Sequence, residues 1–139
     1  MKNINEYIND NKNQEMILEM ARVGFISKNP PLEIYIHTDD PGNIPHFHIR
    51  DYVRSGRSGN EFHTCIQFNS NKYFHHDGKE DVLNSSQRKE LVEFLRSNYR
   101  GRKGYTNWNK LVDDWNDNNS NMNLEEDINM PDYTTIDNN

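Results

Sequence analysis

The stretch Pro45-His46-Phe47-His48-Ile49-Arg50 decides how the rest of the chain is interpreted. Side chains two residues apart point to the same side of a β-strand. The stretch therefore predicts a strand with two histidines and Arg50 on one face and Phe47 and Ile49 on the other. Such alternation is typical of an antiparallel sheet that packs on a core with one face only.

The segments on either side of this stretch predict further strands. Leu32–Thr38 alternates in the same way and is followed by the turn-forming residues 39–43. After the glycine-containing loop 54–59, a third strand is expected from about Glu61 to Phe68, and Tyr73–Phe74 predicts a short fourth strand. Together these segments predict an antiparallel meander.

Two amphipathic helices are expected after the strands. Asn84 or Ser85 would cap the first, and Thr106 or Asn107 would cap the second. Apolar residues recur at helical spacing in both segments, which predicts that both helices cover the apolar face of the sheet. We therefore predict an α+β fold: a three- to four-stranded antiparallel β-meander with helices packed on one face.

The chain length of 139 residues predicts one domain with extensions at both ends. Residues 3–23 have a weak helical pattern, so residues 1–29 are expected to form an N-terminal helical extension to the α+β domain at 30–117. Residues 118–139 are rich in Asn and acids and are expected to form a mobile tail, with Met130–Tyr133 as a segment that could dock.

The charge of the chain is unevenly distributed. The net charge is −6, but residues 111–139 contain 8 of the 22 acids and none of the 16 Lys and Arg residues. The preceding part is therefore mildly basic, so nucleic-acid binding stays open as a hypothesis. A single cysteine excludes an intramolecular disulfide, and no apolar run reaches membrane-spanning length, so we expect a cytoplasmic protein without a membrane partner.

Hairpin pairing predicts which polar side chains lie opposite one another. Pairing of the first two strands around the turn at 39–43 gives the pairs His37–His46, Tyr35–His48 and Glu33–Arg50. Pairing of the next two strands gives His46–Cys65, His48–His63 and Arg50–Glu61. The polar face then contains a charge triad at one end and a cluster of histidines with the only cysteine.

This cluster predicts a candidate metal site. Imidazole and thiolate are ligands of zinc and related metals, so the candidate ligands are His46, His48, His63 and Cys65. Solvated or hydrogen-bonded histidines, or a group that titrates near neutral pH, are the alternatives. If no metal binds, the polar face, which we expect to be open to solvent, is a candidate binding face for a partner. It is formed by Tyr35, His37, His46, His48, Arg50 and His63.

The order of segments resembles the small bacterial proteins grouped as domain of unknown function 4160. That family has a Pro-Pro-His-x-His strand, matched here by Pro45, His46 and His48, and a closing tryptophan motif, matched by Trp115-Asn116. The resemblance spans residues 30–117, and Ile44 stands where the first proline is usual. It implies an α+β fold, a bacterial or phage origin and a toxin–antitoxin-like or defence-associated context, without an established activity.

Three functional hypotheses follow, and the sequence leaves open whether the chain is an enzyme. The first is a binding or regulatory module whose polar sheet face holds a protein partner. The second is a metal-dependent hydrolase or nuclease with zinc on His46, His48 and His63, with Cys65 or His37 as a fourth ligand and Asp51 or Glu61 as a base. The third is a nucleic-acid binder that uses Arg54, Arg57, Arg100, Arg102 and Lys103.

Overall fold

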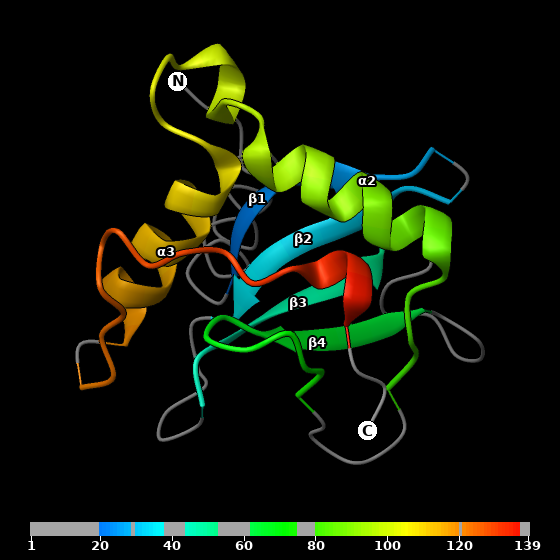
Figure 1. Ribbon diagram of the computed structural model, residues 1–139, viewed down its shortest axis with the longest axis horizontal. Helices are drawn as coiled ribbons and strands as arrows, with labels where there is room; N and C mark the ends of the chain where they lie inside the picture. Colours follow the sequence, from blue (N-terminus) through cyan, green and yellow to red (C-terminus); the bar gives the residue numbers. More distant parts are fainter. Residues whose placement is uncertain are drawn as a thin grey trace, which may run out of the picture.

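The computed structural model describes residues 20–28, 30–37, 44–52, 62–74, 80–119 and 121–136. Within these residues the chain forms an antiparallel sheet with the strand order β1-β2-β3-β4, together with two helices (Figure 1). The predicted α+β meander is therefore confirmed. The strands are β1 Met20–Ile26, β2 Leu32–His37, β3 His46–Asp51 and β4 His63–Gln67. The helices are α2 Ser85–Arg96 and α3 Asn107–Asn118, with the short 3-10 turns η1 Tyr99–Gly101 and η2 Tyr133–Thr135.

Strand β1 replaces part of the expected N-terminal helix. Met20–Ile26 pairs antiparallel with β2, so the helix prediction for residues 3–23 is wrong from residue 20 onward, and residues 1–19 lie outside the described part. The pairing slips between Arg22 and Gly24. A slip of this kind inserts an extra residue and breaks the two-residue alternation by which a strand is identified in a sequence.

The register of the sheet confirms one predicted hairpin and corrects the other. Tyr35 lies opposite His48 and Glu33 opposite Arg50, as predicted for the first pair. In the second pair the residues opposite His48 and Arg50 are Cys65 and His63, two positions from the prediction. A shift by two residues leaves each side chain on its predicted face but changes its neighbours across the strands.

The outer edge of β4 is hydrogen-bonded although β4 is the last strand. The Gln67 amide donates to the Lys72 carbonyl at 3.0 Å, and the Cys65 carbonyl accepts from the Phe74 amide at 2.9 Å. The His63 carbonyl accepts from the Asp81 amide at 2.8 Å, and the His63 amide donates to the Asp81 carboxylate at 2.9 Å. The expected fourth strand at Tyr73–Phe74 is reduced to one bridge, between Ile66 and Tyr73.

Helix α2 covers the apolar face of the sheet, as predicted, and α3 adds side chains to the same core from beside the strands. Figure 1 shows α2 crossing in front of the strands. Each helix begins with a capping box, formed by Asn84 with Gln87 and by Thr106 with Asn109. The core joins residues from every layer: Ile34, Phe47, Ile49 and Ile66 of the sheet, Leu91 and Leu95 of α2, and Leu111 and Trp115 of α3.

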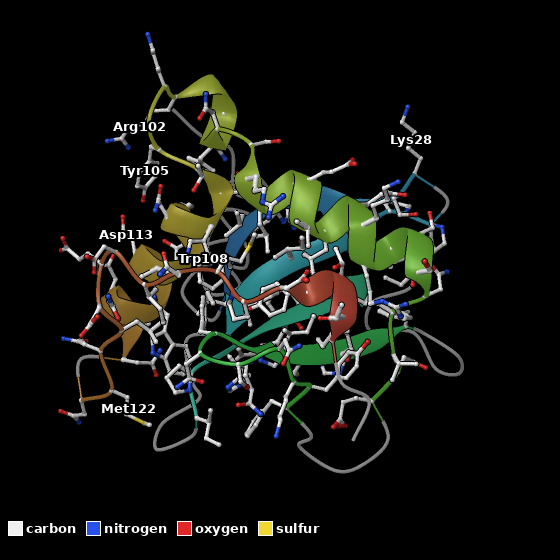
Figure 2. All side chains as sticks on the ribbon, in the orientation of Figure 1. Lys28, Arg102, Tyr105, Trp108, Asp113 and Met122 are labelled. Carbon is white, nitrogen blue, oxygen red and sulfur yellow. The ribbon has the colours of Figure 1, made fainter. Side chains whose placement is uncertain are left out.

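Residues 121–136, which we call the C-terminal strap, pack against this core. Figure 2 shows Trp108 of α3 beside the strap and Met122 near the far end of the helix. The Trp108 indole donates to the Ile128 carbonyl at 2.9 Å, and the Tyr133 hydroxyl donates to the Gln67 carbonyl at 2.6 Å. Leu124, Tyr133 and Ile136 are buried.

The strap overturns part of the tail prediction. Residues 118–139 were expected to form a mobile tail, but residues 121–136 pack against the core. The alternative, that Met130–Tyr133 docks, is supported by the burial of Tyr133. None of the helices in the described ranges has the length and apolar character of a membrane span.

Candidate metal centre

The polar face of the sheet is buried at its centre. The exposed fraction is 4 % for Tyr35, 5 % for His48 and 0 % for His46 and Cys65. The expectation of a wet binding face is wrong for these side chains. His37, Arg50 and His63, which complete the predicted binding face, are half-buried. The centre of this face is therefore packed and not open to solvent.

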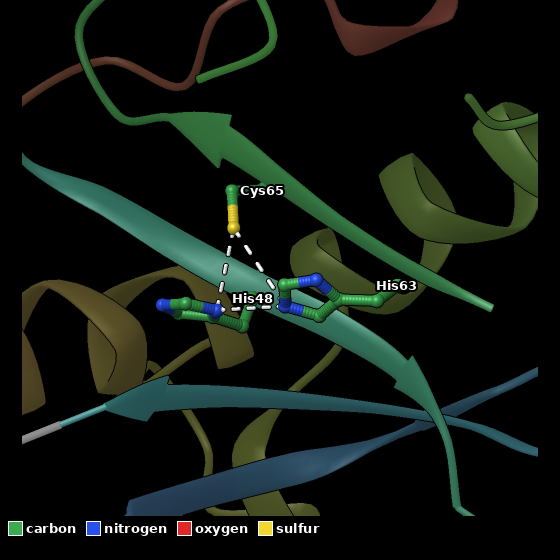
Figure 3. A group of neighbouring side chains, drawn as sticks. All are labelled: His48, His63 and Cys65. Atoms are coloured by element: carbon green, nitrogen blue, oxygen red, sulfur yellow. Dashed lines mark hydrogen bonds between the residues drawn. The ribbon is translucent and has the colours of Figure 1, made fainter. Parts of the chain in front are cut away.

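Three ligand atoms from β3 and β4 converge within this layer (Figure 3). His48 Nδ1 lies 3.1 Å from His63 Nε2 and 3.3 Å from Cys65 Sγ. Cys65 Sγ lies 3.8 Å from His63 Nε2. His63 and Cys65 are two residues apart on β4 and so share a face, while His48 lies directly opposite Cys65 on β3.

The spacing of the three atoms matches a tetrahedral metal site. With Zn–N bonds of about 2.0 Å and Zn–S bonds of about 2.3 Å, tetrahedral angles place two nitrogens about 3.3 Å apart and a nitrogen and a sulfur about 3.5 Å apart. The observed distances of 3.1, 3.3 and 3.8 Å lie close to these values. They also suit hydrogen bonds among one thiol and two imidazoles, which is the competing arrangement.

Stacked rings hold His48 and His63 in this orientation. The ring of His48 stacks on Tyr35 with centroids 5.0 Å apart and on His63 with centroids 5.4 Å apart. The Arg50 guanidinium lies 4.7 Å from the centre of the Tyr35 ring. Because β4 is hydrogen-bonded along both edges, the strand that provides two of the three ligand atoms is also fixed. Such support keeps ligand atoms in position before a metal arrives.

His46, the fourth predicted ligand, lies outside this group. Its Nδ1 donates to the Ile44 carbonyl at 2.7 Å. Its ring packs against Phe74 and Trp115, with centroids 4.4 and 5.6 Å away. His46 thus belongs to the packing between the sheet and α3, and the converging set is His48, His63 and Cys65.

Glu33 of the predicted charge triad has a second arginine partner that the prediction did not include. The buried carboxylate of Glu33 binds Arg50 at 2.9 Å and also binds Arg22 of β1. The expected third member, Glu61, lies outside the described residues. Sequence reasoning missed Arg22 because it assigned this segment to a helix.

Asp51, the candidate base that the structure describes, does not lie at the converging group. Asp51 is paired with Leu32 and therefore shares the core-facing side of the sheet. Glu61 is not described, and Glu33 is paired with two arginines. The arrangement therefore brings together three donor atoms without an adjacent carboxylate among the described residues.

No family model matches the chain, and no curated protein or solved structure is significantly similar to it. The resemblance to domain of unknown function 4160 consequently stays a prediction from the sequence.

Proposed function

We propose that this protein binds one transition-metal ion of the zinc class through His48 Nδ1, His63 Nε2 and Cys65 Sγ. The observation that carries the proposal is the convergence of these three atoms at distances of 3.1 to 3.8 Å. Two imidazoles and a thiolate favour zinc, cobalt or copper over magnesium and calcium, which prefer oxygen ligands.

The number of ligands favours one second candidate function, metal-dependent hydrolysis. Structural zinc sites have four protein ligands, whereas catalytic sites have three and leave one position for water. A zinc ion at such a position lowers the pKa of its bound water and so provides a nucleophile. Metal binding has the stronger support because hydrolysis also requires a base, and Asp51 faces the other side of the sheet.

The hypothesis of a binding module that holds a protein partner on the polar face has less support than metal binding. Such a function requires side chains that a partner can reach, whereas Tyr35, His46 and His48 are buried. For the same reason, the stacking of nucleobases on this face has less support.

The test is the metal content of tag-free protein purified without chelator. We expect about one equivalent of metal in the wild type, and its loss in Cys65→Ser and His63→Gln, which remove one ligand each with little change in volume. His37→Gln is the matched control, because His37 lies on the same face but outside the converging group.

Cobalt(II) titration provides a second readout that does not depend on the metal acquired during expression. A Cys65 thiolate bound to cobalt gives a charge-transfer band in the near ultraviolet, and a tetrahedral site gives intense visible bands. A wild type that retains no metal and gives neither band, while melting cooperatively, would show that the three side chains form only hydrogen bonds.

A further inference from the structure

The link between α2 and α3 concentrates positive charge in a chain that is acidic overall. From Phe94 to Val112 the sequence has five Lys and Arg residues and no acid, whereas the whole chain has a net charge of −6. Arg96, Arg100, Arg102 and Lys103 are exposed, and Lys110 is half-buried. Figure 1 shows this link projecting beyond the sheet between the two helices. The positive charge is therefore concentrated at one corner of the molecule.

The link is an ordered, closed loop. The Tyr99 amide donates to the Tyr105 carbonyl at 2.7 Å, and the Arg102 amide donates to the Tyr99 carbonyl at 2.9 Å. Gly101 and Gly104 have φ values of +74° and +79°, and a Cβ placed on either glycine would meet nothing within 4 Å. The backbone at these two glycines is therefore open to close approach by a ligand.

Two tyrosine rings support the cations of the loop. The Arg102 guanidinium lies 4.3 Å from the centre of the Tyr105 ring, and that of Arg100 lies 5.2 Å from the Tyr99 ring. Lys110 Nζ lies 5.3 Å from Tyr99. A guanidinium that rests on a ring offers its plane for stacking by a nucleobase and its charge for a phosphate.

Asp113 holds one of these rings in place. The Tyr105 hydroxyl donates to the Asp113 carboxylate, and Figure 2 shows Arg102, Tyr105 and Asp113 in succession. Burial raises the pKa of Tyr105, and the hydrogen bond to Asp113 raises it further. The hydroxyl therefore remains a neutral donor, and Asp113, the first acid after the loop, is engaged at its base. Asp114, the next acid, is paired with Lys110.

We propose that the loop Ser97–Tyr105, with Lys110, binds single-stranded nucleic acid without sequence preference. Clustered cations and stacking surfaces are the two requirements of such binding. An anionic membrane would also need exposed apolar side chains to insert, whereas the large apolar groups of this loop are two half-buried tyrosines. The site is separate from the proposed metal centre, because the loop connects the helices and the ligands lie on β3 and β4.

The experiment is fluorescence anisotropy with a labelled mixed-sequence single strand, titrated at several salt concentrations. The test variant is Arg100→Ala/Arg102→Ala/Lys103→Ala. Its control, Lys28→Ala/Lys72→Ala/Lys89→Ala, removes three exposed charges elsewhere and so produces the same net charge. Melting temperatures establish that both variants fold.

We expect binding at low salt by the wild type and the control, and at least about a tenfold loss in the loop variant. The slope of log K against log salt should become shallower by about 2, which corresponds to three lost phosphate contacts on a single strand. Equal losses in both variants, no binding by the wild type at low salt, or loop-dependent binding to phosphatidylserine vesicles but not to the oligonucleotide would each overturn the proposal.

Discussion

His48 and His63 stack on each other although they are not opposite one another in the sheet. His48 is paired with Cys65, and His63 with Arg50, so the two rings are diagonal neighbours with centroids 5.4 Å apart. This diagonal brings both imidazole nitrogens to the sulfur of Cys65. In the predicted register Cys65 would lie opposite His46, and the thiol would be next to a different histidine.

We expect zinc to stabilise the protein through this group. An ion that binds the folded chain alone, at one hundred times its Kd, adds about 2.7 kcal/mol to the free energy of unfolding. Differential scanning calorimetry with and without zinc should therefore show a higher Tm for wild type and His37→Gln, and no rise for Cys65→Ser. The rise should diminish on acidification, because bound imidazole and thiolate must be deprotonated. An equal rise in Cys65→Ser would place the zinc elsewhere.

The Glu33→Gln variant should be strongly destabilised. Glu33 is fully buried, and its carboxylate binds both Arg22 and Arg50, so the substitution leaves two cations without their shared counter-charge. Breaking a buried ion pair costs about 3–5 kcal/mol. We expect a loss of about 3 kcal/mol, at the lower end of this range, because the Arg22 side chain is 45 % exposed and can turn to solvent. Urea denaturation measures this change.

The exposed Glu93 provides the control for this experiment. Glu93→Gln removes one carboxylate charge from the surface of α2 and should change stability by no more than about 0.5 kcal/mol. If Glu33→Gln were as stable as Glu93→Gln, the ion pairs of Glu33 would contribute nothing.

Removal of the C-terminal strap should unfold the protein or abolish cooperative melting. The strap buries Leu124, Tyr133 and Ile136, and such side chains contribute about 1.5–3 kcal/mol each. Their sum is comparable to the total stability of a small domain, about 5–15 kcal/mol. Thermal melting of a chain ending at Asn119 tests this directly, and an unchanged Tm would show that the strap does not stabilise the core.

A milder change in the strap should have a smaller effect. Tyr133→Phe keeps the buried ring but removes the hydroxyl that donates to the Gln67 carbonyl. We expect a loss of about 1 kcal/mol in urea denaturation, the usual contribution of one such hydrogen bond. A loss as large as that caused by truncation would mean that this bond, and not the apolar contact, holds the strap.

Asp114 should make stability depend on pH. Burial raises its pKa above the usual 3.8, the Lys110 ammonium opposes this effect, and Asp117 and Asp113 reinforce it. Between the usual and the raised value the folded chain retains a proton that the unfolded chain has lost, so the free energy of unfolding falls as pH rises through this interval. The cost is complete above the folded-state pKa and absent below the unfolded-state value.

The measurement compares the Tm of Asp114→Asn with that of wild type across this range. The Tm of the variant minus that of wild type should increase as pH rises from about 4 and then become constant. Asp127→Asn, which removes an exposed carboxylate of the strap that does not shift the pKa of Asp114, is the control and should not show this increase. A difference between Asp114→Asn and wild type that is independent of pH would contradict the assignment.

The β2–β3 hairpin and the two helices were predictable because local signals agree. Both strands alternate regularly, and Asn84 and Thr106 have the side chains that capping requires. The β3–β4 register was not predictable to the residue. Alternation determines which face a side chain occupies, but a shift by two residues satisfies the same alternation. The sequence thus predicted all three converging residues, together with His46, but not their mutual distances.

Strand β1 and the strap were missed for different physical reasons. In β1, Gly24 and the slip beside it interrupt the alternation, while the apolar residues before it recur at helical spacing. In the strap, single apolar residues such as Leu124 and Tyr133 stand among polar ones with no period. Their burial depends on the surface of α3 and on the carbonyl of Gln67, neither of which is encoded locally.

The hydrogen bonds along the outer edge of β4 also affect how the protein behaves at high concentration. An unpaired edge strand is a template on which another chain can add a strand, and this is a common origin of fibrillar aggregation. At His63, Cys65 and Gln67 the outward backbone groups already bond to Asp81, Phe74 and Lys72. We expect this edge to resist intermolecular strand addition, and the His63 and Gln67 amides to exchange slowly with deuterium although they lie at the border of the sheet.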